Sequence, residues 1–227
     1  MSAKSAFSIV GLAHKVCIAA ENEGYTPELL NALAERSGLF HQLLQVQLGR
    51  AEVKMLERVP SVLEIIGMIR IPATIKQFVA REHFVVDTSR KARVKIVWLG
   101  DDFDNWFLNK TEAPAAGAKL DYARLTRLMT DDEIRKEIGA GCEETTLAAI
   151  WALMERQLNG ESGILLTNGY ANIFYVRDTN GVLRAVLALW HAGASGWDLS
   201  AYSVSDPIRW NDGRRVFSRN SSHPVIV

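Results

Sequence analysis

Four aspartates lie close together in the sequence and have the chemistry to hold a divalent metal ion. Asp101, Asp102 and Asp104 follow the apolar segment Val94–Leu99, and Asp87 ends the apolar segment before it. Carboxylates at the ends of neighbouring strands can bind Mg²⁺ and activate a water molecule for hydrolysis. The same spacing fits a structural role, in which the three later aspartates cap a short helix. A metal-dependent hydrolase centred on these four aspartates is therefore one alternative hypothesis. The sequence places no glutamate or lysine beside them, which counts against it.

A second set of residues with binding chemistry is the arginines of the later part of the sequence. No lysine follows Lys136, and the basic residues after it are Arg156, Arg177, Arg184, Arg209, Arg214, Arg215 and Arg219. A planar guanidinium group suits phosphates and carboxylates and stacks on aromatic rings. A surface of this kind beside Trp210 would bind nucleic acid or an acidic partner. Residues 161–227 hold six basic and five acidic residues, a net charge of +1, which also fits local ion pairs.

The tryptophans divide into two groups by their surroundings. Four stand at apolar-face positions and are expected in the core: Trp98, Trp151, Trp190 and Trp197. The other two lie in or beside expected loops, where an aromatic ring can contact a partner. We therefore predict a binding surface made of Trp106, Arg209, Trp210, Arg214, Arg215 and Arg219.

The familiar catalytic and cofactor-binding motifs are missing from the sequence. It contains no G-x-G-x-x-G after a strand, no Walker A sequence and no G-x-S-x-G elbow. It also contains no C-x-x-C, H-E-x-x-H or EF-hand pattern. We therefore expect no cofactor and favour a non-enzymatic binding or assembly module over an enzyme. Its expected partner is another protein or a second copy of itself, with nucleic acid as the alternative.

Composition limits the cellular compartment and the kinds of partner that we expect for the protein. Its 227 residues carry no net charge, so they can bury a core and have no overall attraction to nucleic acid or membranes. The apolar segment Ser5–Ala20 is too short to span a bilayer and lacks a signal-peptide cleavage pattern. The two cysteines, Cys17 and Cys142, do not form a disulfide framework. We expect a cytoplasmic protein that does not associate with membranes.

The first part of the chain, residues 1–82, is predicted to be helical. Three helices are expected before residue 50, on the basis of capping residues and apolar spacing. Further on, Ser61-x-x-Glu64 matches a capping box before an apolar run, which Pro72 would end. The periodicity then changes from helical to alternating near residue 82, and this change predicts a boundary there.

Residues 83–221 are predicted to form an α+β domain with a mostly antiparallel sheet, followed by a tail, residues 222–227. Alternating apolar residues predict strands at Phe84–Asp87 and Val94–Leu99. Helices are expected at Asp131–Ile138, which has acidic residues in its first turn, and at Thr145–Leu158, which has an apolar stripe. The fold class is therefore α+β, with a helical N-terminal portion before the sheet.

The sheet is predicted to end in an antiparallel β-meander over Ile164–Arg219. Its expected centre is Val182–Trp190, which is apolar on both faces apart from Arg184. The polar stretch Ser205–Gly213 is expected to be a loop, and Arg214–Arg219 is expected to close the sheet as its last strand.

Four stretches of the sequence resemble a group of uncharacterised bacterial proteins: Phe84–Ser89, Val94–Leu108, Leu165–Arg177 and Arg215–Ser221. The resemblance covers about residues 84–221. It implies a bacterial protein whose later part is a reused module, combined in the group with variable N-terminal parts. It implies no catalytic residue and no ligand.

Overall fold

The computed structural model describes Thr26 and residues 61–220. The three helices expected before residue 50, Cys17 and the predicted tail lie outside the described residues. Among the residues that the structure describes, no helix is long and apolar enough to cross a membrane.

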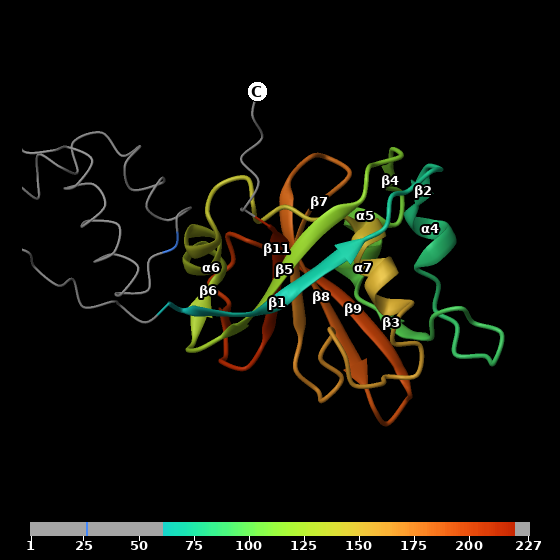
Figure 1. Ribbon diagram of the computed structural model, residues 1–227. Coiled ribbons are helices and arrows are strands. Elements are labelled where there is room, and N and C mark those ends of the chain that lie inside the picture. The colour runs from blue at the N-terminus through green and yellow to red at the C-terminus, as the bar shows by residue number, and fades with distance from the viewer. Residues whose placement is uncertain (1–25, 27–60, 221–227) are drawn as a thin grey trace, which may run out of the picture. The chain divides into compact units, whose positions relative to one another are not determined.

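One seven-stranded sheet organises residues 61–220 (Figure 1). Its order is β1-β5-β11-β7-β8-β9-β3. The strands in that order are β1 Leu63–Ile71, β5 Ala118–Leu125, β11 Arg215–Arg219, β7 Asn172–Arg177, β8 Leu183–His191, β9 Gly196–Ser203 and β3 Ile96–Leu99. The sheet is mixed, because β11 is parallel to β7 and β3 is parallel to β9, while the other neighbours are antiparallel.

The meander itself is β7-β8-β9, and β8 is its central strand, as the apolar content of Val182–Trp190 predicts. The meander starts later than expected, because Ile164–Thr167 is a loop and not a strand. Two buried amides fix this loop. Asn172 bonds both the N–H and the carbonyl of Leu166, and Gln157 bonds both of these groups of Leu165.

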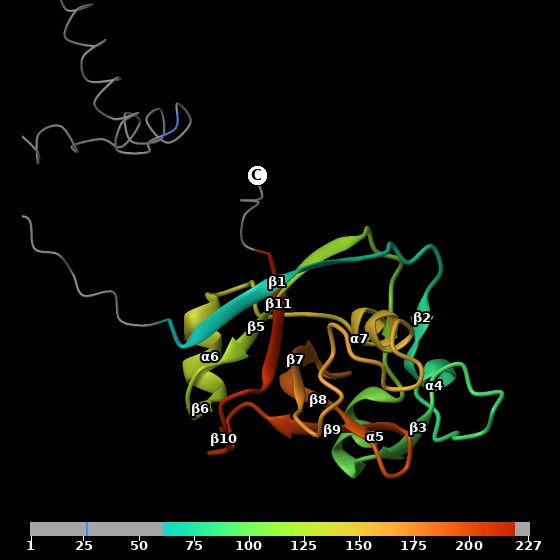
Figure 2. The same cartoon turned by 60° about the horizontal axis from the view of Figure 1, so that its bottom comes forward.

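The sheet is covered on both faces. On one, the α7 face, the buried apolar side chains include those of α4 (Ala80–His83), α5 (Asp101–Phe107) and α7 (Leu147–Met154). On the other, the α6 face, lie α6 (Asp131–Ile138) and a ribbon of β6 (Met129–Thr130) and β10 (Arg209–Trp210). Figure 2 shows α6, β6 and β10 grouped together, away from α5 and α7. A second ribbon pairs β2 (Phe78–Val79) with β4 (Thr111–Glu112).

The prediction of a helical N-terminal portion followed by a mostly antiparallel sheet is wrong. The described part of the protein is mostly sheet, the sheet is mixed, and its helices are four and short. Residues that were expected to be helical form β1 and β2 instead. The sheet therefore extends across residue 82, and the described residues 61–220 fall within one compact unit.

The side chains of the expected capping box have other partners. Ser61 Oγ donates to the carbonyl of Leu63 and to Glu137, and Glu64 accepts from the guanidinium group of Arg124 on β5. Isoleucine-rich segments favour strands when a neighbouring strand is present, because β-branched side chains pack well on a pleated surface. The residues of β5 that pair with β1 lie 47 to 62 positions later in the chain, from Ile71↔Ala118 to Leu63↔Leu125, so local sequence does not show the pairing.

The last described strand, β11, also differs from its predicted place. It does not close the sheet at an edge but lies inside it, between β5 and β7. Its parallel pairing with β7 is short, since only Arg215 and Val216 have partners there.

Candidate functional site

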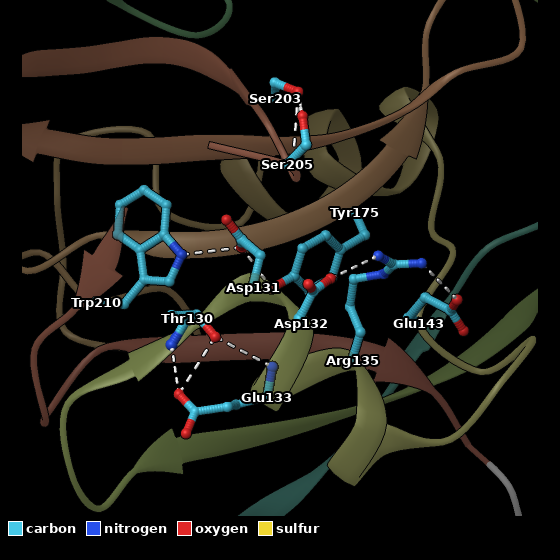
Figure 3. A network of polar contacts seen from close by, with 10 residues as sticks. All are labelled: Thr130, Asp131, Asp132, Glu133, Arg135, Glu143, Tyr175, Ser203, Ser205 and Trp210. Carbon is cyan, nitrogen blue, oxygen red and sulfur yellow. Dashed lines mark hydrogen bonds and ion pairs between the residues drawn. The ribbon is translucent and has the colours of Figure 1, made fainter. Parts of the chain in front are cut away.

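Trp210, predicted as an exposed contact residue, is buried on the α6 face. Its side chain is 5% exposed, and its indole Nε1 donates to Asp131 Oδ1 at 2.9 Å. The hydroxyl of Tyr175 on β7 donates to the same oxygen at 2.7 Å. Figure 3 shows the two donors approaching the carboxylate from different elements. Trp210, Asp131 and Tyr175 thus join β10, α6 and β7, and we refer to these three residues as the polar joint.

Asp131 is in place because of how α6 begins. Thr130 is the N-cap residue and its Oγ1 accepts from the N–H of Glu133, while its own N–H donates to Glu133 Oε2. This capping box fixes the first turn and directs Asp131 at the sheet. The sequence predicts α6 correctly, Asp131–Ile138, but does not show that one of its acidic residues points inward.

The electrostatics of the polar joint are those of a desolvated acid. Burial raises the pKa of Asp131, against the opposing effect of the hydrogen bonds from Tyr175 and Trp210. Burial and the neighbouring carboxylate raise the pKa of Tyr175 well above its usual value. Asp131 Oδ2 is buried and has no hydrogen-bond partner among the described residues. The hydrogen bonds of the joint thus connect α6, β7 and β10 through one buried carboxylate.

The four arginines of the predicted binding surface do not form one surface. Arg214 lies on the α6 face, with its guanidinium carbon 5.6 Å from the centre of the Trp210 ring. Arg215 lies on the α7 face, where it donates to the carbonyls of Gly163 and Ile164. Arg209 and Arg219 are exposed at separate strands, β10 and β11.

Trp106, the remaining member of that surface, is half-buried on α5. The guanidinium carbon of Arg184 on β8 lies 3.9 Å from the centre of its ring. Arg184 also donates to Asp178 Oδ2 at 3.0 Å, and Asp178 is buried in the turn between β7 and β8. Burial alone would raise the pKa of Asp178, but the Val182 N–H and Arg184 outweigh it and lower this pKa. Trp106 therefore covers an internal ion pair.

The four aspartates of the hypothetical metal site occupy two places. Asp101, Asp102 and Asp104 lie in the first turn of α5 with exposed side chains, while Phe103 beside them is buried. Asp87 accepts from the N–H of Ser89, and this hydrogen bond lowers its pKa. Within residues 61–220, no three acidic, histidine or cysteine side chains are placed to share a metal ion.

Sequence reasoning missed the largest concentration of exposed apolar side chains, which lies on β1. Ile65 is 62% exposed, and Ile66 and Met68 are each 45% exposed. Among the described strands β1 pairs with β5 alone, so its other edge is free of strand pairing there. We call these three residues with the free edge the β1 surface. The isoleucines of β1 are the sequence signal that could have indicated this strand. The segment was instead interpreted as a capped helix.

A shallow groove continues the β1 surface on the α6 face. Its volume is about 160 Å³, and it lies between β1, β5, β11 and the end of α6. Ile65, Ala123, Ile138 and Val216 give it apolar walls, and the charged residues Asp121, Glu137 and Arg219 also line it. Its size suits a single apolar side chain from a docked chain, the kind of pocket in which binding energy concentrates.

A bulge shapes the middle of β1. Ile65 lies opposite Ala123 and Gly67 lies opposite Tyr122, so Ile66 is an extra residue. Gly67 packs closely against Tyr122, since a Cβ there would lie 2.7 Å from the Tyr122 hydroxyl oxygen and would displace this side chain. Bulges of this kind bend an edge strand and interrupt its regular hydrogen-bonding pattern.

Comparisons with protein-family models, with curated proteins and with solved structures each found no match.

Proposed function

We propose that this protein is a non-enzymatic assembly module that associates with a second copy of itself through the β1 surface. The observation that carries the proposal is the exposure of Ile65, Ile66 and Met68 on an edge strand. Exposed apolar patches on edge strands favour association, and proteins usually protect such edges with charges or short strands. The proposal keeps the cytoplasmic location that the two isolated cysteines indicate.

The bulge makes the β1 surface suitable for a two-fold partner. Because Ile66 is an extra residue, Leu63 and Ile65 share the face of Met68 and Arg70, as their partners on β5 show. A second β1 running antiparallel can then place its Met68 beside Ile65, and its Ile65 beside Met68. Four exposed apolar side chains would cluster at the symmetry axis, as a self-complementary interface requires.

The charges beside β1 also fit a second copy. Arg70 and Lys119 lie opposite each other near the end of β1, and Arg156 donates to the Arg70 carbonyl at 2.9 Å. No ion pair joins these three cations to an acid of the described chain. At the start of β1, Ser61 bonds the exposed carboxylate of Glu137 at 2.8 Å. An antiparallel copy brings the acidic end against the basic end, which favours this orientation.

The same bulge limits the strength of the association. A continuous ladder of backbone hydrogen bonds cannot form across Ile66, so side chains supply the centre of the interface. We expect an interface confined to one edge strand to be small, and small interfaces are weak and transient. We expect a dissociation constant on the order of 10 µM.

The two alternative functions have no comparable support. Nucleic-acid binding needs arginines that reach phosphates, whereas Arg215 donates to backbone carbonyls and Arg214 stacks on a buried tryptophan. A metal-dependent hydrolase needs carboxylates that converge, and such a group is lacking among the described residues.

Sedimentation velocity of the full chain between about 1 and 200 µM tests the proposal, since that range brackets the expected dissociation constant. We expect a monomer–dimer equilibrium that the variant Ile65→Asp/Met68→Asp abolishes. The matched control is Ile75→Asp, because Ile75 is 91% exposed and lies outside β1. A wild-type chain that stays monomeric at the highest concentration, or a dimer that the double variant leaves intact, would refute the proposal.

A further inference from the structure

A second cavity, which shares Arg219 with the groove beside Ile65, lies on the α7 face. Its volume is about 310 Å³, and it is bounded by the end of β1, the loop before β5 and the first turn of α7. Six alanines form much of its wall: Ala113, Ala115, Ala116, Ala118, Ala148 and Ala149. Short side chains leave space that larger residues would fill, and with Ile71 and Leu120 they make an apolar interior.

The one acid of this cavity is already engaged. Glu112 Oε1 accepts from the N–H of Leu147 and Glu112 Oε2 from the N–H of Ala148, each at 2.9 Å. These are free backbone donors at the start of α7, where a negative charge is stabilised. Because both oxygens and the charge are satisfied within the protein, Glu112 is not available to bind a cationic ligand.

The hydroxyl groups of the cavity are engaged as well. Thr74 Oγ1 accepts from the N–H of Ala115, and Thr146 Oγ1 accepts from the N–H of Ala149. Thr145 Oγ1 donates to the carbonyl of Tyr175. Thr145 therefore has no hydroxyl hydrogen left to donate, whereas Thr74 and Thr146 only accept and can still donate to an anion.

Arg219 is the one cation that lines the cavity. Its side chain is exposed and makes no hydrogen bond or ion pair with the described residues. A guanidinium group is always charged and binds a carboxylate through two parallel hydrogen bonds. The cavity thus combines an apolar interior with one unpaired cation that can bind an anion.

We infer that this cavity binds small apolar carboxylates, with the hydrocarbon part against the alanine wall and the carboxylate on Arg219. If each non-hydrogen atom takes the ~30 Å³ of a water molecule in the liquid, the cavity holds roughly ten such atoms. A straight-chain acid of about eight carbons has that size. Ligand cavities are commonly apolar with a few placed polar groups, as here.

The test uses three probes that differ in head group alone: octanoate, octan-1-ol and octylamine. Titration of the full chain by calorimetry should give the tightest binding for octanoate, about tenfold tighter than for the alcohol, since hydrogen bonds to a charged group contribute most. Octylamine should bind most weakly. Equal binding of all three, or no saturable binding of octanoate, would overturn the inference.

Two variants assign the binding to its parts. Arg219→Gln should weaken octanoate binding about tenfold, to the level of octan-1-ol, and Arg219→Lys should restore part of the loss. Ala116→Phe should weaken octanoate and octan-1-ol alike, because the ring occupies the cavity. Circular dichroism confirms that each variant is folded. Unchanged octanoate binding in Arg219→Gln would rule out Arg219 as the anion donor, and with it the inference.

Discussion

The polar joint and the β1 surface differ in where they place their residues. The joint buries a carboxylate, a phenol and an indole, which are groups that elsewhere carry out chemistry or recognition. The β1 surface exposes two isoleucines and a methionine, which elsewhere form cores. The contrast shows that residue type alone does not locate a functional surface. In this protein the polar groups best suited to chemistry hold elements together, and the residues that we propose for contact are ordinary apolar ones.

The largest expected effect of a single substitution is on the joint. Trp210→Ala should lower the free energy of unfolding by about 3–5 kcal/mol, because it removes a buried aromatic ring and leaves a cavity. Chemical denaturation monitored by circular dichroism measures this. The matched control is Trp98→Ala, since Trp98 is 51% exposed on β3 and should cost little. Equal costs for the two tryptophans would contradict the assignment of Trp210 to the interior.

The next largest effect is expected at the β1 surface, where substitution should weaken association and leave stability nearly unchanged. Ile65→Asp/Met68→Asp should weaken self-association at least 100-fold, while changing the free energy of unfolding by less than about 1 kcal/mol, as is usual for exposed positions. Sedimentation velocity and denaturation on the same samples give both quantities. A large loss of stability without a change in association would mean that these side chains belong to the fold and not to an interface.

A smaller effect should follow from the charges that flank β1. Arg70→Glu should weaken association about fivefold, because it places two acids against each other across the interface. Adding Glu137→Arg to it should restore association, since the pair is then reversed in sign. Failure of the double variant to recover would mean that these two residues do not face each other in the dimer.

The smallest effect should be a change in how stability depends on pH. The pKa of Asp131 is raised in the folded protein, so the folded state holds this proton more tightly than the unfolded state. Its contribution to stability is therefore complete below the ordinary aspartate pKa and is lost as the pH rises through the raised value. The variant Asp131→Asn does not lose stability in this way, because asparagine has no proton to release in this pH range.

The free energy of unfolding of the wild type, relative to Asp131→Asn, should accordingly decrease as the pH rises above about 4. Taking the difference between the two proteins cancels the contributions of the other carboxylates to the pH dependence. One of these is Asp178, whose lowered pKa gives the opposite trend. A difference that increases with pH would show that the environment of Asp131 stabilises the charged form.

The elements that the sequence predicts well are those whose signals are local. The acidic residues in the first turn of Asp131–Ile138 predict α6 at its observed bounds, and the apolar content of residues 182–190 identifies β8 as the centre of the meander. Both depend on residues within a few positions of each other. Period and capping rules describe such short-range preferences directly.

The elements that the sequence predicts badly depend on distant partners. β1 reads as a capped helix until β5 is known to lie beside it, and β11 gives no sign that it lies inside the sheet. The exposure predicted for Trp210 in the binding surface was wrong for the same reason. Trp210 stands in a polar loop sequence, and its burial follows from a two-residue strand, β10, that pairs with β6 about 80 residues earlier.

The position of β11 has a consequence for how the chain folds. β11 joins the β1–β5 pair to the β7–β8–β9 meander, and it is the last described strand to be synthesised. Until it emerges from the ribosome, the two halves of the sheet have no strand between them, and β5 and β7 each present an open edge. Such unpaired edges expose a nascent chain to aggregation. Completion of this sheet is therefore a late event, and chaperone binding should be strongest before residue 219 is released.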